Sequence, residues 1–368
     1  MLNNMDGKRN GRNIYFKTLE LLRQNKTCVL CTVTGTQGAA PQKPGSSALF
    51  DKSRPVWGTI GGGAVEHAIQ QKVAEAIGTQ ASGHYFFDLI NDDPDDGDIG
   101  CGGGMSILLD AAPGEHFSLF SEIQEDIKKG ISGVLITAIK TGRQGETNIR
   151  RMWATQKDAN NGLHGLTGSV AEALKNMLHN PVQDDFREFV VKQSGAKVKQ
   201  VILLETLAPL AKLLIAGAGH VGKALSHLAK LIDFEVIVWD DRKELANQQN
   251  FPDADKILTG RMDRKPRNFK AGRNTFIVIA TSSHQSDAAL LKNFIRSGAG
   301  YIGMIGGKKK MAQIKRKFLE NGWAIQEEWE KIYAPVGLEI HSKTVSEIAM
   351  SIAAQLIQVR YELNHNEQ

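Results

Sequence analysis

Residues 213–222 read Leu-Leu-Ile-Ala-Gly-Ala-Gly-His-Val-Gly, an apolar segment that runs directly into a glycine-rich turn. A helical pattern follows at 223–231, and a second apolar segment at 234–239 ends in Asp240. A strand, a glycine turn, a helix and a second strand ending in an acid form the dinucleotide-binding pattern of Rossmann domains. The sequence therefore predicts a parallel sheet flanked by helices in this part of the chain.

The residues of this turn have different expected roles. Gly217 allows the tight turn, Gly219 lets a phosphate approach the backbone, and Gly222 lets the helix pack closely on the strand. Free amides at the start of the helix favour an anion, and Asp240 lies where a ribose-binding acid belongs. His220 stands in the turn, where the helix dipole favours a neutral ring that touches the ligand. The alternative is a turn that holds no nucleotide, because a fold does not fix a function.

Length and composition predict two soluble domains. A chain of 368 residues exceeds one typical core, and we expect an N-terminal mixed α/β domain at 1–208 and a C-terminal Rossmann-like domain at 209–368. Within the first domain, 141–208 reads as a variable region of short strands and polar loops. No apolar run is long enough to span a bilayer, and residues 1–12 lack the apolar core of a secretory signal. We therefore expect the protein in the cytoplasm, and we do not expect it to bind a membrane.

Charge and periodicity add two expectations. The net charge of +5 is modest and spread along the chain, so it does not indicate a nucleic-acid partner. Alternating strand and helix patterns over 212–319 imply right-handed crossovers within a parallel sheet. The last helix is expected to begin with a capping box, Thr344 to Glu347, and to bury an apolar stripe that includes Ile352 and Leu356.

Two further glycine turns and one loop are candidate anion sites. Gly61, Gly62 and Gly63 open one predicted helix, and the turn containing Gly306 opens another that starts with three lysines, 308–310. Lysines in the first turn of a helix oppose its dipole, and a bound anion would offset this cost. The alternative to an anion site is that these lysines form a solvated basic face. The proline-stiffened loop 38–45 carries Lys43, which is suited to a phosphate or carboxylate, unless this is an ordinary rigid loop.

Three cysteines cannot form a disulfide framework, and they fit a reducing compartment. Cys28 and Cys31 lie in a strand-like segment, where side chains three residues apart point to opposite faces, so zinc or redox chemistry is not favoured. Cys101 stands among four glycines and is a candidate sulfur ligand or sulfur carrier; the alternative is a tight-turn residue.

His284 and Asp287 follow the third predicted Rossmann strand, at the edge where ligands bind in such sheets. The alternative is a helix cap formed by a neighbouring serine, with His284 simply exposed. The sequence contains no His-Glu-x-x-His, no paired Cys-His zinc spacing and no Gly-x-Ser-x-Gly motif. It therefore predicts neither a metal site nor a hydrolase triad.

Several segments together resemble the accessory factors of xanthine dehydrogenase and related molybdenum hydroxylases, the XdhC/CoxI type. No single segment is specific, but they follow the family's order over most of the chain: 34–45, 58–66, 100–103, the Gly217 turn with 240–242, 301–306 and 335–340. The sequence departs from the family at Ala64, where many relatives have cysteine, and at Gly307, Lys308 and Val345.

The resemblance implies a molybdenum-cofactor chaperone. Such a protein binds the pterin cofactor (molybdopterin), protects it during terminal sulfuration and passes it to a xanthine dehydrogenase-type molybdenum hydroxylase. A cysteine desulfurase is the implied sulfur source, a homodimer the expected assembly, and the role that of a non-enzymatic accessory protein. The alternatives are an NAD(P)-dependent oxidoreductase, with His284 as its acid or base, and a nucleotide-sensing Rossmann protein.

Overall fold

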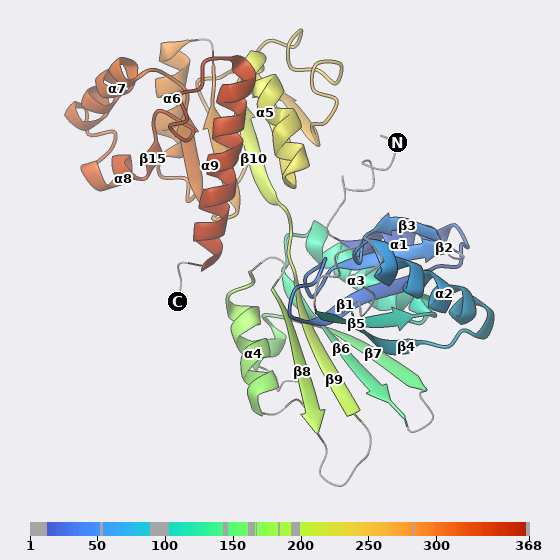
Figure 1. Cartoon of the computed structure of the whole chain (residues 1–368). Coiled ribbons are helices and arrows are strands. Elements are labelled where there is room, and N and C mark those ends of the chain that lie inside the picture. The colour runs from blue at the N-terminus through green and yellow to red at the C-terminus, as the bar shows by residue number, and fades with distance from the viewer. Residues whose placement is uncertain are drawn as a thin grey trace. The chain divides into compact units, whose positions relative to one another are not determined.

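The computed structural model describes residues 13–51, 54–88, 103–142, 146–160, 166, 168–182, 185–192, 199–281 and 283–365. The chain divides into two compact units, Met1–Pro209 and Leu210–Gln368, drawn in blue to yellow-green and in yellow to red in Figure 1. The first unit contains antiparallel sheets, and the second contains one parallel sheet. This confirms the predicted fold class, a Rossmann-like C-terminal domain joined to a mixed α/β domain.

The second unit is built on a six-stranded parallel sheet with the order β12-β11-β10-β13-β14-β15. Its bounds are β10 Ala211–Ala216, β11 Phe234–Asp240, β12 Lys256–Thr259, β13 Thr275–Ile279, β14 Tyr301–Met304 and β15 Ile332–Tyr333. The first strand, β10, lies between β11 and β13, so the strand order reverses between β10 and β13. In open parallel sheets, ligands bind outside the carboxyl ends of the strands at such a reversal.

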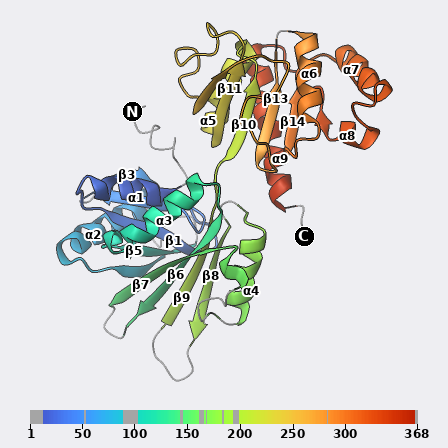
Figure 2. The same ribbon diagram turned by 180° about the vertical axis from the view of Figure 1, so that it is seen from behind.

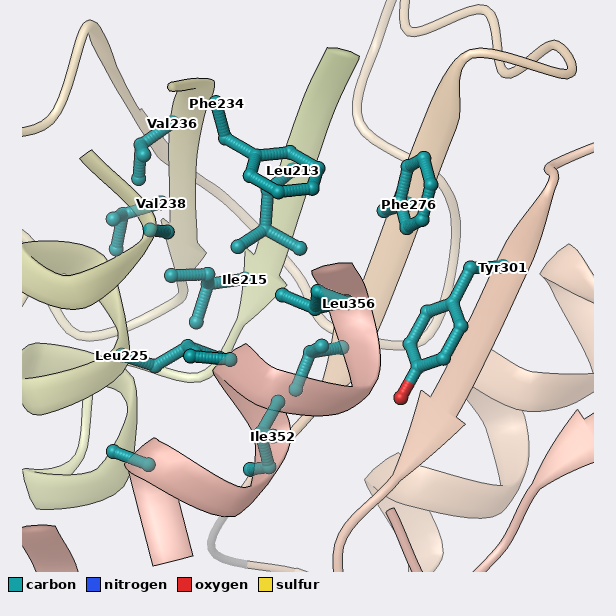
Figure 3. Close-up of a cluster of buried hydrophobic side chains, with 14 of the residues drawn as sticks. Leu213, Ile215, Leu225, Phe234, Val236, Val238, Phe276, Tyr301, Ile352 and Leu356 are labelled. Carbon is teal, nitrogen blue, oxygen red and sulfur yellow. The ribbon is translucent and has the colours of Figure 1, made fainter. Parts of the chain in front are cut away.

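Helices cover both faces of this sheet. They are α5 His220–Leu231, α6 His284–Phe294, α7 Lys308–Glu320, α8 Gln326–Glu330 and α9 Val345–His365. One buried cluster joins α5 and α9 to the sheet through Leu213, Leu225 and Leu356 (Figure 3), and the opposite cluster joins α6 and α7 through Phe294 and Phe318. The helices that follow β10 and β13 therefore lie on opposite faces, and their N-termini flank the strand reversal.

The last helix begins and packs as the sequence predicts. The amide of Glu347 donates to Thr344 Oγ1 at 3.2 Å, and Glu347 Oε2 accepts from the Thr344 amide at 2.9 Å. Hydrogen bonds from the backbone amides of Thr344 and Lys343 to this carboxylate lower the pKa of Glu347. Ile352 and Leu356 are fully buried in the cluster beneath α5. The capping box and the buried stripe are both confirmed.

The first unit contains a five-stranded antiparallel sheet with the order β3-β2-β1-β5-β4. The strands are β1 Val29–Gln37, β2 Ser47–Asp51, β3 Arg54–Gly58, β4 Gly83–Asp88 and β5 Gly104–Asp110. Helix α2, Gly63–Thr79, packs on one face, and α1, Ile14–Arg23, and α3, Phe117–Lys128, pack in a second cluster. Residues of β1 alternate between these clusters because successive strand side chains point to opposite faces.

A second antiparallel sheet of this unit draws most of its strands from 141–208. Its order is β7-β6-β9-β8, with β6 Gly133–Thr141, β7 Thr147–Thr155, β8 Phe186–Lys192 and β9 Lys199–Leu207. Helix α4, Gly168–His179, lies beside this sheet (Figure 2), and its Leu174 and Met177 are buried in the cluster between them. Short 3-10 turns lie at Pro113–His116 and Asp158–Asn160. The described residues of 141–208 thus include the predicted strands and also a helix, and polar residues on the exposed faces blur the sequence pattern of these elements.

Candidate functional site

The glycine turn after β10 lies at the carboxyl edge of the parallel sheet. The Gly217 amide donates to the carbonyl of Trp239 at 2.9 Å, and the Ala280 amide donates to the carbonyl of Ala216 at 2.8 Å. Gly217 has φ +131°, and an added Cβ there would overlap the Ala280 carbonyl. The ends of β10, β11 and β13 therefore meet around this turn, and its tight path requires glycine.

The other two glycines differ in their surroundings. A Cβ on Gly222 would overlap the carbonyl of Gly217 and lie 3.3 Å from Ile215 Cγ2, so glycine permits the close approach of α5 to the turn. Gly219, the N-cap of α5, has φ −79° and no atom within 4 Å of a Cβ built there. Glycine has no side chain to cap the first helix amides, which leaves those donors for an external acceptor.

Asp240 ends β11 and is 2% exposed. Its Oδ2 accepts from the Ala218 amide at 2.6 Å and from Arg242 Nη2 at 2.9 Å. Its Oδ1 accepts from the Arg242 amide at 3.0 Å and from Arg242 Nε at 2.9 Å. Burial alone would raise the pKa of Asp240, but these hydrogen bonds outweigh it and lower the pKa to about 2. The acid expected to bind ribose holds the glycine turn and Arg242 in place.

A second acid, hydrogen bonded within the protein, lies beyond the carboxyl ends of β13 and β14. Asp287, in the first turn of α6, is fully buried and accepts from Thr281 Oγ1 and Lys310 Nζ, each at 2.6 Å. Lys310, in the first turn of α7, also donates to the Ile305 carbonyl at 3.2 Å. This ion pair ties the N-termini of α6 and α7 together. A ligand would reach the Asp287 carboxylate only where the Lys310 pair opens.

The remaining predicted residues of this edge lie around the same helix N-termini. His220 begins α5 and is exposed, and Gly306, with φ +155°, lies between β14 and α7. His284 begins α6, while its side chain falls outside the part of the chain that the structure describes. Lys309 is exposed, as in a solvated basic face, whereas Lys310 is largely buried. Ligand contact by these residues stays a prediction.

The first unit brings together three segments that are separate in sequence. A Cβ on Gly61, which has φ +125°, would lie 3.1 Å from Pro41 Cγ, so the 38–45 loop packs on the turn that opens α2. A Cβ on Gly103 would overlap the carbonyl of Ala39. Gly62 is the N-cap of α2 and has open space around it, and Lys43 is exposed. A 17-residue helix thus starts with uncapped amides beside a loop that carries a cation.

The cysteines that the structure describes are buried. Cys31 points into the α2-side cluster and Cys28 into the opposite one. Burial raises the pKa of Cys28 to about 11 and raises that of Cys31 further, so both thiols stay protonated near neutral pH. Cys101 lies outside the described residues. Within those residues, no group of three His, Cys, Asp or Glu side chains is placed to hold a metal ion.

Sequence reasoning missed a buried polar cluster in the first unit. Arg151 pairs with Asp110, their side chains 2% and 4% exposed, while Tyr15 donates to Glu205 at 2.5 Å. Arg151, Tyr15 and Glu205 line a cavity of about 10 Å³, which has room for one water. In the sequence, Asp110 at the end of a strand and Arg151 in a strand of alternating polarity look like ordinary surface residues. No local signal therefore identifies them as a buried pair.

Comparison with known proteins places these features in a family. A family model described as the XdhC Rossmann domain matches residues 213–356, and a model described as the XdhC and CoxI family matches residues 21–88. The chain belongs to the XdhC and CoxI family. The first match contains the glycine turn after β10, and the second contains the 38–45 loop with the start of α2. Both candidate sites therefore lie within the residues that the two family models match.

Three known proteins are similar to this chain. The chain is 24% identical over 343 residues to a Bacillus subtilis (strain 168) protein named as a probable subunit of xanthine dehydrogenase, covering 92% of this chain and 95% of that protein. It is 26% identical over 200 residues to uncharacterized protein YqeB of Escherichia coli (strain K12), covering 52% of this chain and 35% of that protein. A crystal structure described as a xanthine dehydrogenase from Bacillus halodurans is similar in fold, with a TM-score of 0.72, 22% identity and coverage of 96% and 98%.

The helices were also compared with the length and hydropathy that a membrane span requires. Across the described ranges, every helix is too short or too polar to cross a bilayer.

Proposed function

We propose that this protein is an accessory factor that binds the molybdenum cofactor, holds it while a cysteine desulfurase supplies sulfur, and delivers it to a xanthine dehydrogenase-type hydroxylase. The family assignment supports an accessory role in that system. The observation that carries the binding step is the start of α2, where the uncapped amides after Gly62 lie beside the loop carrying Lys43.

The residues at this site fit part of the cofactor. The pterin carries a phosphate, and both free helix amides and an ammonium group suit a phosphate. Sulfur ligation of the metal finds no donor among the described cysteines, because Cys28 and Cys31 are buried and protonated. Cys101 stays the predicted sulfur ligand or carrier. When bound, the cofactor supplies the redox chemistry of the hydroxylase, and this chain's residues bind it, shield it and release it.

Native mass spectrometry of the protein titrated with molybdenum cofactor tests the proposal. We expect one cofactor per chain in the wild type and loss of retention in Gly62→Val, whose side chain would occupy the open space at the start of α2. Gly78→Val is the matched control, because Gly78 lies in the last turns of the same helix and also has open space around it. Equal retention by both variants would remove the α2 turn from the site.

A second comparison addresses sulfur. Cys101→Ser should retain the pterin phosphate contact but carry less terminal sulfur, measured as reactivation of an apo-hydroxylase by the delivered cofactor. Full reactivation by this variant would remove the thiol from the mechanism. Absence of cofactor binding by the wild type would refute the chaperone function itself.

The Rossmann turn supports a second binding function, for a nucleotide. The observation that favours it is Gly219, which has a permissive φ and open space at the start of α5, next to the strand reversal. Gly219→Val should abolish nucleotide binding with little loss of stability. Retention of NAD(P) alone, without molybdenum cofactor, would favour the oxidoreductase alternative and direct attention to His284.

A further inference from the structure

The end of β11 suggests which nucleotide the Rossmann turn would select, on the proposal that this turn binds one. The acid at this position commonly accepts hydrogen bonds from a ribose 2′-hydroxyl, whereas a nearby arginine accommodates a 2′-phosphate. The chain has both residues, Asp240 and Arg242. Selectivity therefore depends on which of them is free to meet the sugar.

The lone pairs of Asp240 are already used. A carboxylate offers about four acceptor positions. Within the described residues, four donors reach Asp240 within 3.0 Å: the Ala218 amide, the Arg242 amide, and Nε and Nη2 of Arg242. The side chain of Asp240 is 2% exposed. A ribose diol would have to displace the guanidinium before it could donate to this carboxylate.

Arg242, unlike Asp240, is partly exposed and has a nitrogen that the ion pair does not use. Its side chain is 37% exposed, and the pair with Asp240 uses Nε and Nη2 but not Nη1. An arginine can bind a phosphate with the nitrogens that remain while its other edge holds a carboxylate. The exposed acids Asp241 and Glu244 are screened by solvent, so they oppose a phosphate less than a direct hydrogen bond attracts it.

We infer that Arg242, held against Asp240, makes the Gly217–Gly222 turn selective for nucleotides that carry a 2′-phosphate over those with a free 2′-hydroxyl. Asp240 acts as the positioning residue that fixes both Arg242 and the glycine turn through Ala218. The selected ligand class is a 2′-phosphorylated adenine dinucleotide or mononucleotide.

Isothermal titration calorimetry with four probes tests the inference: NADP⁺, NAD⁺, 2′,5′-ADP and 5′-AMP. We expect wild type to bind each 2′-phosphorylated probe roughly ten-fold or more tightly than its partner, the range of one or two charge-assisted hydrogen bonds. Arg242→Ala should remove this preference and strengthen NAD⁺ binding, because Asp240 becomes free for the diol. Lys243→Ala, an exposed neighbouring cation, should leave the preference unchanged.

The outcomes separate this inference from the proposal beneath it. Equal or tighter binding of NAD⁺ by the wild type overturns the selectivity while keeping the turn as a nucleotide site. An equal loss of preference in Arg242→Ala and Lys243→Ala also overturns it, because general charge rather than the held guanidinium would then be responsible. Absence of binding for all four probes refutes both the nucleotide site and its selectivity.

Discussion

Replacing Gly222 with alanine should destabilise the second unit, whereas the same change at Gly219 should not. The new Cβ at 222 overlaps the Gly217 carbonyl and lies 3.3 Å from Ile215 Cγ2, so α5 or the turn must move. Such overpacking costs about 1–3 kcal/mol. For a unit of this size each kcal/mol shifts Tm by roughly 2–4 °C, so we expect a decrease of about 2–12 °C.

Gly219→Ala is the internal control because it adds the same methyl group three residues earlier. Its φ of −79° suits alanine, and no atom lies within 4 Å of the new Cβ. The reduced freedom of the unfolded chain stabilises by about 0.4–1 kcal/mol. Alanine is a poorer N-cap than glycine, which offsets much of this gain.

Thermal unfolding followed by differential scanning calorimetry would distinguish the two variants, with the transition of the second unit compared in each. The reasoning fails if Gly222→Ala melts with the wild type, or if Gly219→Ala loses as much stability as Gly222→Ala. Either result would mean that the close approach of α5 to the turn does not depend on the missing side chain.

Three further predictions follow from buried charges and thiols. Folding lowers the pKa of Asp240 from 3.8 to about 2, so its ionised form stabilises the folded state above pH 3.8, and this contribution is lost as the pH falls toward 2. The Tm difference between wild type and Asp240→Asn should therefore narrow as the pH is lowered from 3.8 to 2. Lys310→Met should lower the free energy of unfolding, measured in urea, by about 3–5 kcal/mol, because it leaves the Asp287 carboxylate buried without its cation. Lys309→Met, at an exposed neighbour, should change this free energy by less than about 0.5 kcal/mol. Cys28, whose pKa is raised to about 11 by burial, should react with iodoacetamide at pH 8 much more slowly in the native protein than in urea, as peptide mass spectrometry would show.

The Rossmann half was predictable because its local signals agree with its tertiary structure. Buried parallel strands are continuous apolar runs, and helix α5, His220–Leu231, contains the predicted helical segment 223–231. The short strand β12, Lys256–Thr259, was missed because its residues are only partly buried and lie at the edge of the sheet. Helix α4, Gly168–His179, was missed because its apolar stripe lies among polar segments whose packing partners are distant in sequence.

The positions of the candidate residues in the fold were predictable, but their hydrogen bonds were not. Sequence spacing placed Asp240 at the end of β11 and Asp287 at the start of α6, and the structure has them there. The partners of these acids depend on side-chain geometry across loops, which spacing does not determine. Lys310 lies 23 positions from Asp287, and only the folded sheet brings α7 beside α6.

The bonds of these two acids restrict what the carboxyl edge of the sheet can offer a ligand. With Asp240 and Asp287 both hydrogen bonded within the protein, neither is poised to exchange a proton with a substrate, since a general acid or base needs an accessible lone pair or proton. Among the described groups of this edge, the helix amides after Gly219 and Gly307 and the outward edge of Arg242 are open to a ligand. These groups all favour anions. They suit the binding and release of a phosphorylated ligand, as the proposed delivery function would require, while His284 at the start of α6 stays the candidate acid or base of the oxidoreductase alternative.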